Sequence, residues 1–375
     1  MTIKAFDYLR LLPEIEQEVH EAFRRVLRSG WLLLGPETEA LERELAEWIG
    51  ARHCVAVHSG TTALHLALRA LGVGTGDRVV TVANTCSPTA AAIRLAGAEP
   101  AFVDVDEDSL MMDVDRAAEA IGGRTKCLLP VHLWGDAVEI ERLVELADER
   151  GVPVVEDCAQ AQGTRVRLRG AGSATRQVGT FGALGCFSFY PTKNLGAFGD
   201  GGAVVTDDGE LAERVRALRM YGYRGGQVSE IDGANGRISE VQAALLRVKL
   251  RVLDDWLARR RRVAERYRRG LEPTELRVPR RAPRVEHSYH QFVVRSPDRD
   301  GLAAALDAAG IGYGIHYPVP LHAMPAYRRF ATAPLPVTER AAGEVLSLPI
   351  HEALTDAEVD RVVAVVAAWQ RGEPA

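Results

Sequence analysis

Between residues 54 and 206, short apolar runs alternate with longer segments that have the apolar spacing of helices. Seven runs have the length and composition of buried strands: 54–57, 79–83, 100–105, 127–131, 152–157, 183–190 and 202–206. Helical spacing occurs between them, at 62–71, 87–97, 113–121 and 137–150. This alternation predicts an α/β fold in which a mostly parallel sheet lies between two layers of helices. Ligands of such folds bind beyond the carboxyl ends of the strands.

The pattern changes on both sides of this stretch. Two helices are predicted before it, at 14–29 and 37–49, and a long charged helix is predicted to run from Ser239 toward Gly270. A connector rich in proline and arginine then leads to the last predicted elements, strand 291–295 and helices 300–309 and 355–370. We therefore expect a large domain over residues 1–250, which includes an N-terminal helical segment, and a smaller C-terminal α+β domain over 251–375.

The composition argues against several classes of protein. The chain has 375 residues, of which 47% are hydrophobic, and a formal net charge of -5, so it has no general attraction for nucleic acid or an anionic membrane. We predict neither export nor a membrane span, because the apolar run 31–34 is far too short to cross a bilayer. The five cysteines include no C-x-x-C pair, which favours a reducing compartment, and we expect a cytoplasmic protein. His287 and His290 directly precede a predicted strand, and we predict no metal site.

Residues 59–62, Ser-Gly-Thr-Thr, connect a predicted strand to the start of a predicted helix. Backbone amides, hydroxyl groups and the positive end of the helix converge there, so a phosphate could bind. Ordinary helix capping by serine or threonine uses the same residue types. This segment alone leaves both interpretations open.

Two side chains of opposite charge follow predicted strands. Asp157 ends the strand 152–157, and Lys193 lies in the turn after the strand 183–190. Such a pair suits an enzyme that uses pyridoxal phosphate, because the lysine forms an imine with the cofactor and the carboxylate keeps the pyridine nitrogen protonated. The alternatives are an aspartate that caps the next helix and a solvated surface lysine. Nearby glycines favour the first interpretation, since they allow close approach of the backbone to a ligand: Gly196, Gly199, Gly201 and Gly202.

The strand that leads to Lys193 is predicted to present two polar side chains on one face. Successive strand residues alternate in direction, so Ser188 and Tyr190 point one way while Phe187 and Phe189 point the other. If Lys193 faces the same crevice, Ser188 can donate to a cofactor phosphate and Tyr190 can line a substrate pocket.

Six segments together resemble the DegT-type family of pyridoxal phosphate-dependent sugar aminotransferases. They occur in the family's order: SGW…GPE at 29–37, SGTTAL at 59–64, EDCAQA at 156–161, SFYPTKN at 188–194, NGRISEVQAA at 235–244 and HYP…LH at 316–322. The resemblance covers almost the whole chain. It implies the aspartate aminotransferase-type fold (fold type I), a cofactor bound by the large domain, and a homodimer with each active site at the subunit interface.

The resemblance also implies roles for individual residues. Lys193 would be the Schiff-base lysine and Asp157 the partner of the pyridine nitrogen. Cys86 stands where many relatives have an aromatic ring that stacks on the cofactor, and a small buried filler is the alternative for it. The other implied cofactor contacts are Gln160 at the ring oxygen, Gly60, Thr61 and Ser188 at the phosphate, and Asn235 at the phosphate held by the other subunit. The implied substrate contacts are Tyr190, His316 and Tyr317 in the hexose site. Separately, Arg224 lies in the glycine-rich segment 220–227, and we predict that it binds the diphosphate of a nucleotide sugar.

The same resemblance predicts the reaction. Members that aminate C-3 of a dTDP-linked keto sugar commonly read SFYPGKN, from which this chain differs at Thr192, whereas C-4 enzymes more often have histidine at the position of Tyr190. We therefore expect transfer of an amino group from L-glutamate to C-3 of a nucleotide-linked keto-deoxysugar, in amino-sugar biosynthesis. Amination at C-4 and amination of a keto-cyclitol such as an inosose remain open.

A non-catalytic regulatory protein that binds DNA is a remote alternative, supported only by the four arginines at 259–262. On a helix, these arginines spread around the surface among other residue types. We interpret the run as a solvated helix face and expect no nucleic-acid or membrane partner.

Overall fold

The computed structural model describes residues 2–282 and 284–373, and at its centre lies a sheet with the strand order β3-β2-β4-β5-β8-β9-β1. Two parallel bridges, Leu128 to Val154 and Val131 to Asp157, connect its β4 and β5 portions. Neighbouring strands run parallel except for β9, which is antiparallel to β8 and β1, so the prediction of a mostly parallel sheet is confirmed. The strands are β1 (His53–Val57), β2 (Arg78–Val82), β3 (Glu99–Val103), β4 (Thr125–Leu128), β5 (Val155–Asp157), β8 (Leu184–Ser188) and β9 (Gly202–Thr206).

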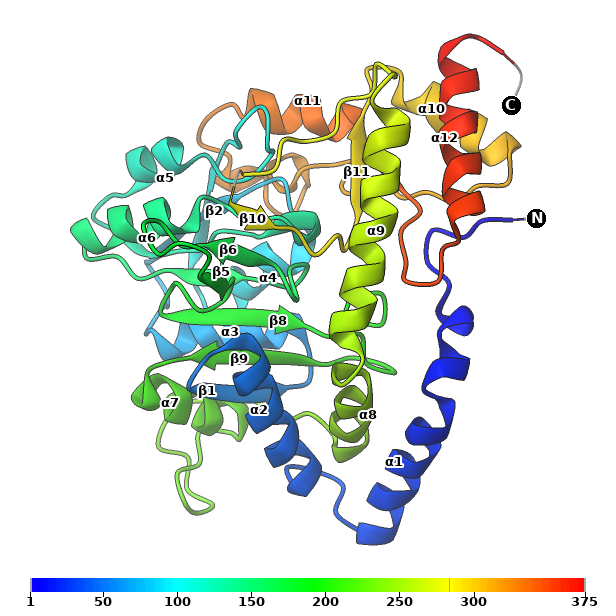
Figure 1. Ribbon diagram of the computed structural model, residues 1–375. Coiled ribbons are helices and arrows are strands. Elements are labelled where there is room, and N and C mark those ends of the chain that lie inside the picture. The colour runs from blue at the N-terminus through cyan, green and yellow to red at the C-terminus, as the bar shows by residue number, and fades with distance from the viewer. Residues whose placement is uncertain (1, 283, 374–375) are drawn as a thin grey trace.

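Helices cover both faces of this sheet, which gives the predicted three-layer arrangement (Figure 1). One face packs against α3 (Gly60–Ala70), α4 (Ser87–Leu95) and α7 (Gly209–Arg219). The other packs against α2 (Pro36–Ile49), α5 (Val114–Ala120), α6 (Ile140–Glu149) and α8 (Glu240–Leu250). In β1, Val55 and Val57 enter the first core while Cys54 and Ala56 enter the second, as the two-residue period of a strand requires.

Capping side chains determine where several helices begin. Ser59, Asp113 and Asp208 accept hydrogen bonds from backbone amides in the first turns of α3, α5 and α7. For α3, the cap places the amino end of the helix directly after the carboxyl end of β1.

The C-terminal part of the chain has a core of its own. There α9 (Leu253–Leu271), α10 (Arg299–Ala308) and α12 (Asp356–Gln370) pack around an antiparallel pair, β11 (Phe292–Arg295) and β12 (Val345–Leu348). Ile3 joins this core and is bridged to Ile311, so the first residues of the chain lie against its C-terminal part. The division into domains at residue 250 stays a prediction.

The remaining elements are short or peripheral. They are α1 (Glu16–Ser29), α11 (Pro336–Glu344), β6 (Arg165–Arg167), β7 (Thr175–Gln177), β10 (Val285–Glu286) and the 3-10 helices Tyr8–Arg10, Leu12–Glu14, Leu133–Gly135, Leu321–Ala323 and Arg328–Phe330. Of the helices in the described part of the chain, none is both long and apolar enough to cross a membrane.

The prediction of one long helix from Ser239 toward Gly270 is wrong, because the chain forms two. α8 ends at Leu250 and α9 begins at Leu253, so the helix is interrupted at Arg251 and Val252. The reason is tertiary packing: α8 packs against α1 and α2, whereas α9 packs against α12 (Figure 1). Neither glycine nor proline marks the break, so the local sequence could not place it.

The interpretation of the arginine run as a solvated face is wrong for Arg260. This side chain is 1% exposed, and its Nε donates to Glu352 Oε1 at 2.7 Å. Its neighbour Arg259 forms a surface ion pair with Glu14. Because α12 and the segment before it cover part of α9, one arginine of the run is enclosed between elements that are distant in sequence.

Candidate active site

A cavity of about 340 Å³ is lined by the carboxyl ends of β5 and β8 and by the amino end of α3. Its volume falls in the range of small-molecule sites, roughly 300–1,000 Å³. Most of the side chains predicted from the sequence line this one cavity: Gly60, Thr61, Cys86, Asp157, Gln160, Ser188, Tyr190, Lys193, His316 and Tyr317. The topology thus brings together segments that are far apart in the chain.

Lys193 lies in the turn after β8, and its backbone N–H donates to the carbonyl of Tyr190 at 2.8 Å. Its Nζ lies 3.4 Å from His290 Nε2. Burial lowers the pKa of Lys193 to about 8, although the charges of Asp157 and Cys86 act in the opposite direction. The amine can therefore take up and release a proton close to neutral pH.

Asp157 ends β5 and is 3% exposed. Its Oδ2 accepts a hydrogen bond from Thr89 Oγ1 at 2.9 Å, and its Oδ1 accepts one from the backbone N–H of Ala159 at 3.1 Å. Burial raises the pKa of Asp157, while these two hydrogen bonds and the charge of Lys193 oppose the rise. The carboxylate is thus held rigidly in a place where a positively charged ligand group would stabilise its ionised form.

The amino end of α3 forms a tight cradle with β8 and β9. A Cβ atom at Gly60 would lie 2.5 Å from Ser188 Cβ, and one at Gly202 would lie 2.5 Å from the carbonyl carbon of Ser59. Only glycine fits at both positions. The first backbone amides of a helix have no partner within it, so together with the hydroxyls of Thr61 and Ser188 they can hold a phosphate.

The side-chain amide of Gln160 forms one hydrogen bond to a residue outside the cavity lining and one to a residue within it. Its Oε1 accepts from the backbone N–H of Trp134 at 2.8 Å, and its Nε2 donates to Tyr317 Oη at 2.8 Å. Burial raises the pKa of Tyr317, and a hydrogen-bond contact with Cys86 adds to the rise. Cys86 is half-buried and lies in the cavity wall beside this tyrosine.

The open side of the cavity carries aromatic and imidazole groups. Tyr190 is 54% exposed, whereas Phe187 and Phe189 on the other face of the strand are buried, as the strand alternation predicts. His316 Nδ1 lies 2.9 Å from Ser347 Oγ. Burial lowers the pKa of His316 to about 4, with a contribution from the charge of Lys193, so its imidazole is neutral at neutral pH.

Asn235 and Arg224 lie outside this cavity. Asn235 is exposed, and its Oδ1 accepts from Arg237 Nε at 3.0 Å. Arg224 is also exposed, with its Nε 3.8 Å from Glu230 Oε2. Their expected contacts with a cofactor phosphate and a substrate diphosphate remain predictions, and that of Asn235 requires a second subunit.

The structure adds residues that sequence reasoning did not assign to the site, namely Thr89, Asp200, His290 and Gln291. Thr89 lies on the first turn of α4, three positions after Cys86, and this spacing could have predicted that it lies near the site. The sequence raises His290 only as a candidate metal ligand. No local pattern indicated that it would contact Lys193.

A buried group outside the cavity comprises His132, Glu156 and Cys158, whose possible ligand atoms lie within 4.8 Å of one another. Glu156 accepts three hydrogen bonds of 2.7–2.8 Å from backbone amides of the 179–182 loop and contacts His132 Nε2 at 3.0 Å. Burial raises the pKa of the Cys158 thiol well above its ordinary value. Both carboxylate oxygens of Glu156 already accept hydrogen bonds. The group therefore fixes the loop that leads into β8.

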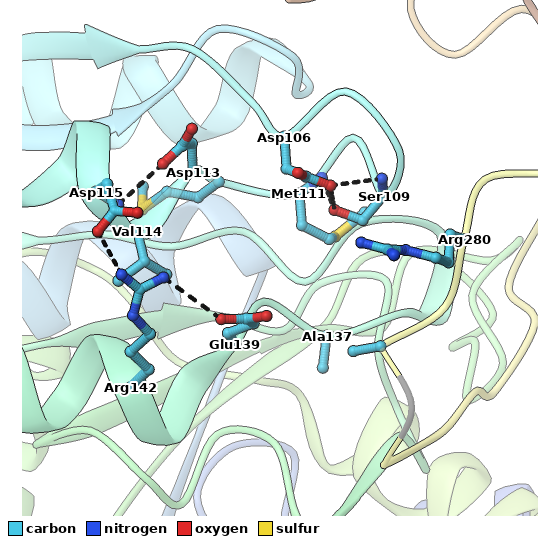
Figure 2. Close-up of a pocket in the computed structure, with 12 residues that line it drawn as sticks. Asp106, Ser109, Met111, Asp113, Val114, Asp115, Ala137, Glu139, Arg142 and Arg280 are labelled. Carbon is cyan, nitrogen blue, oxygen red and sulfur yellow. Dashed lines mark hydrogen bonds and ion pairs between the residues drawn. The ribbon is translucent and has the colours of Figure 1, made fainter.

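A second pocket, of about 170 Å³, shares no residue with the cavity (Figure 2). It lies between the 106–115 segment, the start of α6 and Arg280. Arg142 pairs there with Asp115, and its Nη1 lies 3.7 Å from Glu139 Oε2.

A sheet of this strand order, with a lysine and a buried aspartate in one cavity beyond its strand ends, defines a fold type I aminotransferase. The chain belongs to the DegT/DnrJ/EryC1/StrS aminotransferase family, whose sequence model matches residues 13–367.

The relatives that match nearly the whole chain include a protein named as a transaminase and one named as a sensory transduction protein. A dTDP-3-amino-3,4,6-trideoxy-alpha-D-glucose transaminase from Micromonospora megalomicea is 44% identical over 374 residues, which cover 98% of each chain. The erythromycin biosynthesis sensory transduction protein EryC1 of Saccharopolyspora erythraea is also 44% identical, over 98% of this chain and 100% of that protein.

Solved structures agree in fold. DesV of Streptomyces venezuelae, in complex with a ketimine intermediate, superposes with a TM-score of 0.93 at 44% identity and 98% coverage of both chains. NtdA of Bacillus subtilis, with bound cofactor PMP, gives a TM-score of 0.89 at 27% identity, over 99% of this chain and 86% of that chain.

Proposed function

We propose that this aminotransferase uses pyridoxal 5′-phosphate (PLP) to transfer the amino group of L-glutamate to C-3 of a dTDP-linked keto-deoxysugar. One observation carries the proposal: a half-buried amine, Lys193, and a buried carboxylate, Asp157, line the same cavity beyond the carboxyl ends of parallel strands. The PMP-bound relative supports the cofactor, and the dTDP-amino-sugar transaminase supports the substrate class.

The residues present fit PLP at both of its ends. The amino end of α3, with Thr61 and Ser188, suits the phosphate. Asp157 suits a protonated ring nitrogen, because it is a buried carboxylate whose neighbours in the described chain are hydrogen-bond donors. When bound, PLP supplies an electron sink that allows a proton to leave the substrate carbon that bears the amino group.

The chain's own groups hold the reactants and move the proton. Lys193 would hold the cofactor in the resting enzyme, and its free amine would accept and return a proton at Nζ. A pKa of about 8 makes both protonation states of this amine accessible near neutral pH. Asp157 is fixed by Thr89 and Ala159, so its charge stays in place during the reaction.

The open side of the cavity suits a hexose. Tyr190, His316 and Tyr317 offer hydroxyl and imidazole groups that can hydrogen-bond sugar hydroxyls. Tyr190 in place of histidine favours C-3 over C-4, in line with the names of the relatives.

A spectroscopic titration tests this proposal. The PLP-loaded protein should be yellow, lose the colour with L-glutamate, and regain it with a dTDP-3-keto-6-deoxyhexose. Recovery only with a 4-keto sugar or a keto-cyclitol would overturn the sugar assignment. Salt-sensitive DNA binding without any visible absorbance would favour a regulatory protein instead.

Covalent attachment tests the lysine itself. Borohydride reduction of the loaded protein followed by peptide mass analysis should place the cofactor on Lys193. Lys249 is a matched comparison, because burial lowers its pKa to about 8 as well, yet it lies outside the cavity and donates to the carbonyl of Gly196 at 2.6 Å. Lys193→Ala should abolish turnover, and a variant with nearly full activity would refute the assignment.

A homodimer with shared active sites completes the proposal. Large apolar side chains that a partner could cover are exposed on α1 and the segment after it: Phe23, Leu27, Trp31, Leu32 and Leu33. Mixed dimers test whether Asn235 acts across the interface. Lys193→Ala and Asn235→Ala should each be impaired alone, and mixing the two after mild dissociation should restore part of the activity. No restoration, with mixed dimers shown to form, would contradict the shared site.

A further inference from the structure

His290 forms part of the cavity wall and contacts the Lys193 amine. Its Nε2 lies 3.4 Å from Lys193 Nζ, and its side chain lines the cavity with Gln291 beside it. The residue is 7% exposed and lies two positions before β11, in the C-terminal part of the chain. The contact therefore joins a turn of the central sheet to an element that is 97 residues away in sequence.

The backbone around His290 is held in place by a buried ion pair. Arg260 donates from Nη1 to the carbonyl of Tyr289 at 2.9 Å and to that of His290 at 3.2 Å. The same guanidinium donates from Nε to Glu352 Oε1 at 2.7 Å, with both partners almost fully buried. This arrangement fixes the position from which the imidazole reaches Lys193.

The imidazole is neutral under working conditions. Burial lowers the pKa of His290 well below its ordinary value, and the charges of Lys193, Arg260 and His316 contribute to the shift. A neutral ring with an acceptor at Nε2 receives a hydrogen bond from Nζ and carries its own proton on Nδ1. In the described part of the chain, Nδ1 has no hydrogen-bond partner. Packing alone does not explain a buried imidazole with an unused polar atom, because an apolar side chain would fill the space without that penalty.

We propose that His290 is a positioning residue for the Lys193 amine: Nε2 accepts a hydrogen bond from Nζ and keeps the released amine directed into the cavity. This inference rests on the proposed function, in which the amine alternates between attached and free states. Among the hydrogen-bond contacts of the described residues, Nζ has His290 as its partner. Asp157 accepts from Thr89 and Ala159 instead, and His316 Nδ1 contacts Ser347.

The pH dependence of Lys193 reactivity tests the contact without any turnover. The full-length protein is freed of cofactor and labelled with trace acetic anhydride at a series of pH values, and the Lys193 peptide is quantified by mass spectrometry. A neutral acceptor stabilises the ammonium form, so His290→Phe should lower the midpoint of labelling by roughly one pH unit. His290→Gln places an amide oxygen near the position of Nε2 and should restore the midpoint.

Kinetics provide the second readout. We expect His290→Phe to lower kcat by about 10- to 100-fold with little change in KM for the sugar, because the amine is misplaced rather than the substrate. His290→Gln should recover most of that loss. In His290→Asn, the side chain stays polar but is too short to reach Nζ, so this variant should behave like His290→Phe. It keeps the test valid if the phenylalanine variant fails to fold.

His287 supplies the matched control. It is 8% exposed, its ring stacks on Tyr289 at 4.0 Å, and its Nδ1 accepts from the backbone N–H of Tyr289 at 2.8 Å, away from the cavity. His287→Phe should leave the labelling midpoint of Lys193 unchanged. The inference is overturned if folded His290→Phe or His290→Asn keeps the wild-type midpoint and kcat. A wild-type protein without transamination would refute the proposed function instead, and the labelling result would still decide the contact.

Discussion

The cavity around Lys193 and the pocket in Figure 2 are both lined by charged side chains, but they differ in how those charges are solvated. In the pocket, the side chains of Arg142 and Asp115 are 42% and 70% exposed and pair with each other. In the cavity, Asp157 is 3% exposed and Lys193 is half-buried, and their hydrogen-bond partners in the described chain are uncharged groups.

This difference distinguishes a surface pocket from a site whose groups can take part in a reaction. Exposed ion pairs contribute about 0–1 kcal/mol and leave their groups close to their solution behaviour. Burial shifts the pKa values of Lys193 and Asp157 even though their opposite charges act on each other, and a charged ligand group can stabilise the ionised carboxylate further. Burial and the pKa shifts that it causes therefore mark the active site better than the size of a hollow or the number of its charges.

The strongest test of this difference exchanges one aspartate in each hollow for asparagine. Asp157→Asn keeps the shape but removes the charge that would stabilise a protonated ring nitrogen, so kcat should fall about 10³-fold, or about 4 kcal/mol. Asp115→Asn should keep its activity within a factor of about 2. Steady-state kinetics with the sugar substrate measure kcat of both variants. Equal losses of kcat would show that the burial of Asp157 has no role in catalysis.

The second test concerns the ion pair behind the cavity wall. Arg260→Ala leaves Glu352 buried and without its cation, so the free energy of unfolding should fall by about 3–5 kcal/mol. The exposed pair supplies the comparison, since Arg142→Ala should lower the free energy of unfolding by less than about 1 kcal/mol. Urea denaturation of both variants decides the matter. A loss below about 1 kcal/mol for Arg260→Ala would mean that the wall does not depend on this pair.

The sequence predicted those parts of the site that lie within one strand, turn or helix start. Lys193 and Asp157 follow strands, and the amino end of α3 follows β1, so local patterns were enough to place them in the crevice. The contacts of His290 and Thr89 could not be predicted in this way. They join residues that are 97 and 68 positions apart, and only the topology brings them together.

The errors have the same cause. Helical periodicity describes one apolar face, so it cannot show that Arg260 is enclosed by elements on a second side. The break at Val252 likewise arises because α8 and α9 pack against different neighbours. The expected contacts of Asn235 depend on a second subunit and remain untested for that reason.

A third test measures the energetic penalty of the desolvated Lys193 amine in the cofactor-free protein. The folded pKa of Lys193, about 8, lies below its ordinary value of 10.5, so the unfolded chain binds the proton more tightly. The penalty is complete below pH 8 and is relieved as pH rises toward 10.5. Lys193→Met lacks this penalty and should be more stable than the wild type at pH 7 by up to about 3 kcal/mol, an advantage that disappears between pH 8 and 10.5. Urea denaturation across this pH range is the measurement, with Arg142→Met as a control whose difference should not vary with pH.

The smallest expected effect separates a helix cap from a ligand contact. Ser59 caps α3 in the cavity, and Asp113 caps α5 beside the pocket in Figure 2. Since both side chains accept from first-turn amides, Ser59→Ala and Asp113→Ala should each lower the free energy of unfolding by about 1 kcal/mol. Only Ser59 adjoins the proposed phosphate site, so Ser59→Ala should also release PLP more readily during dialysis, by up to about tenfold if one hydrogen bond is lost. Equal cofactor retention in the two variants would assign Ser59 to capping alone and place phosphate binding on the remaining amides and hydroxyls of the cradle.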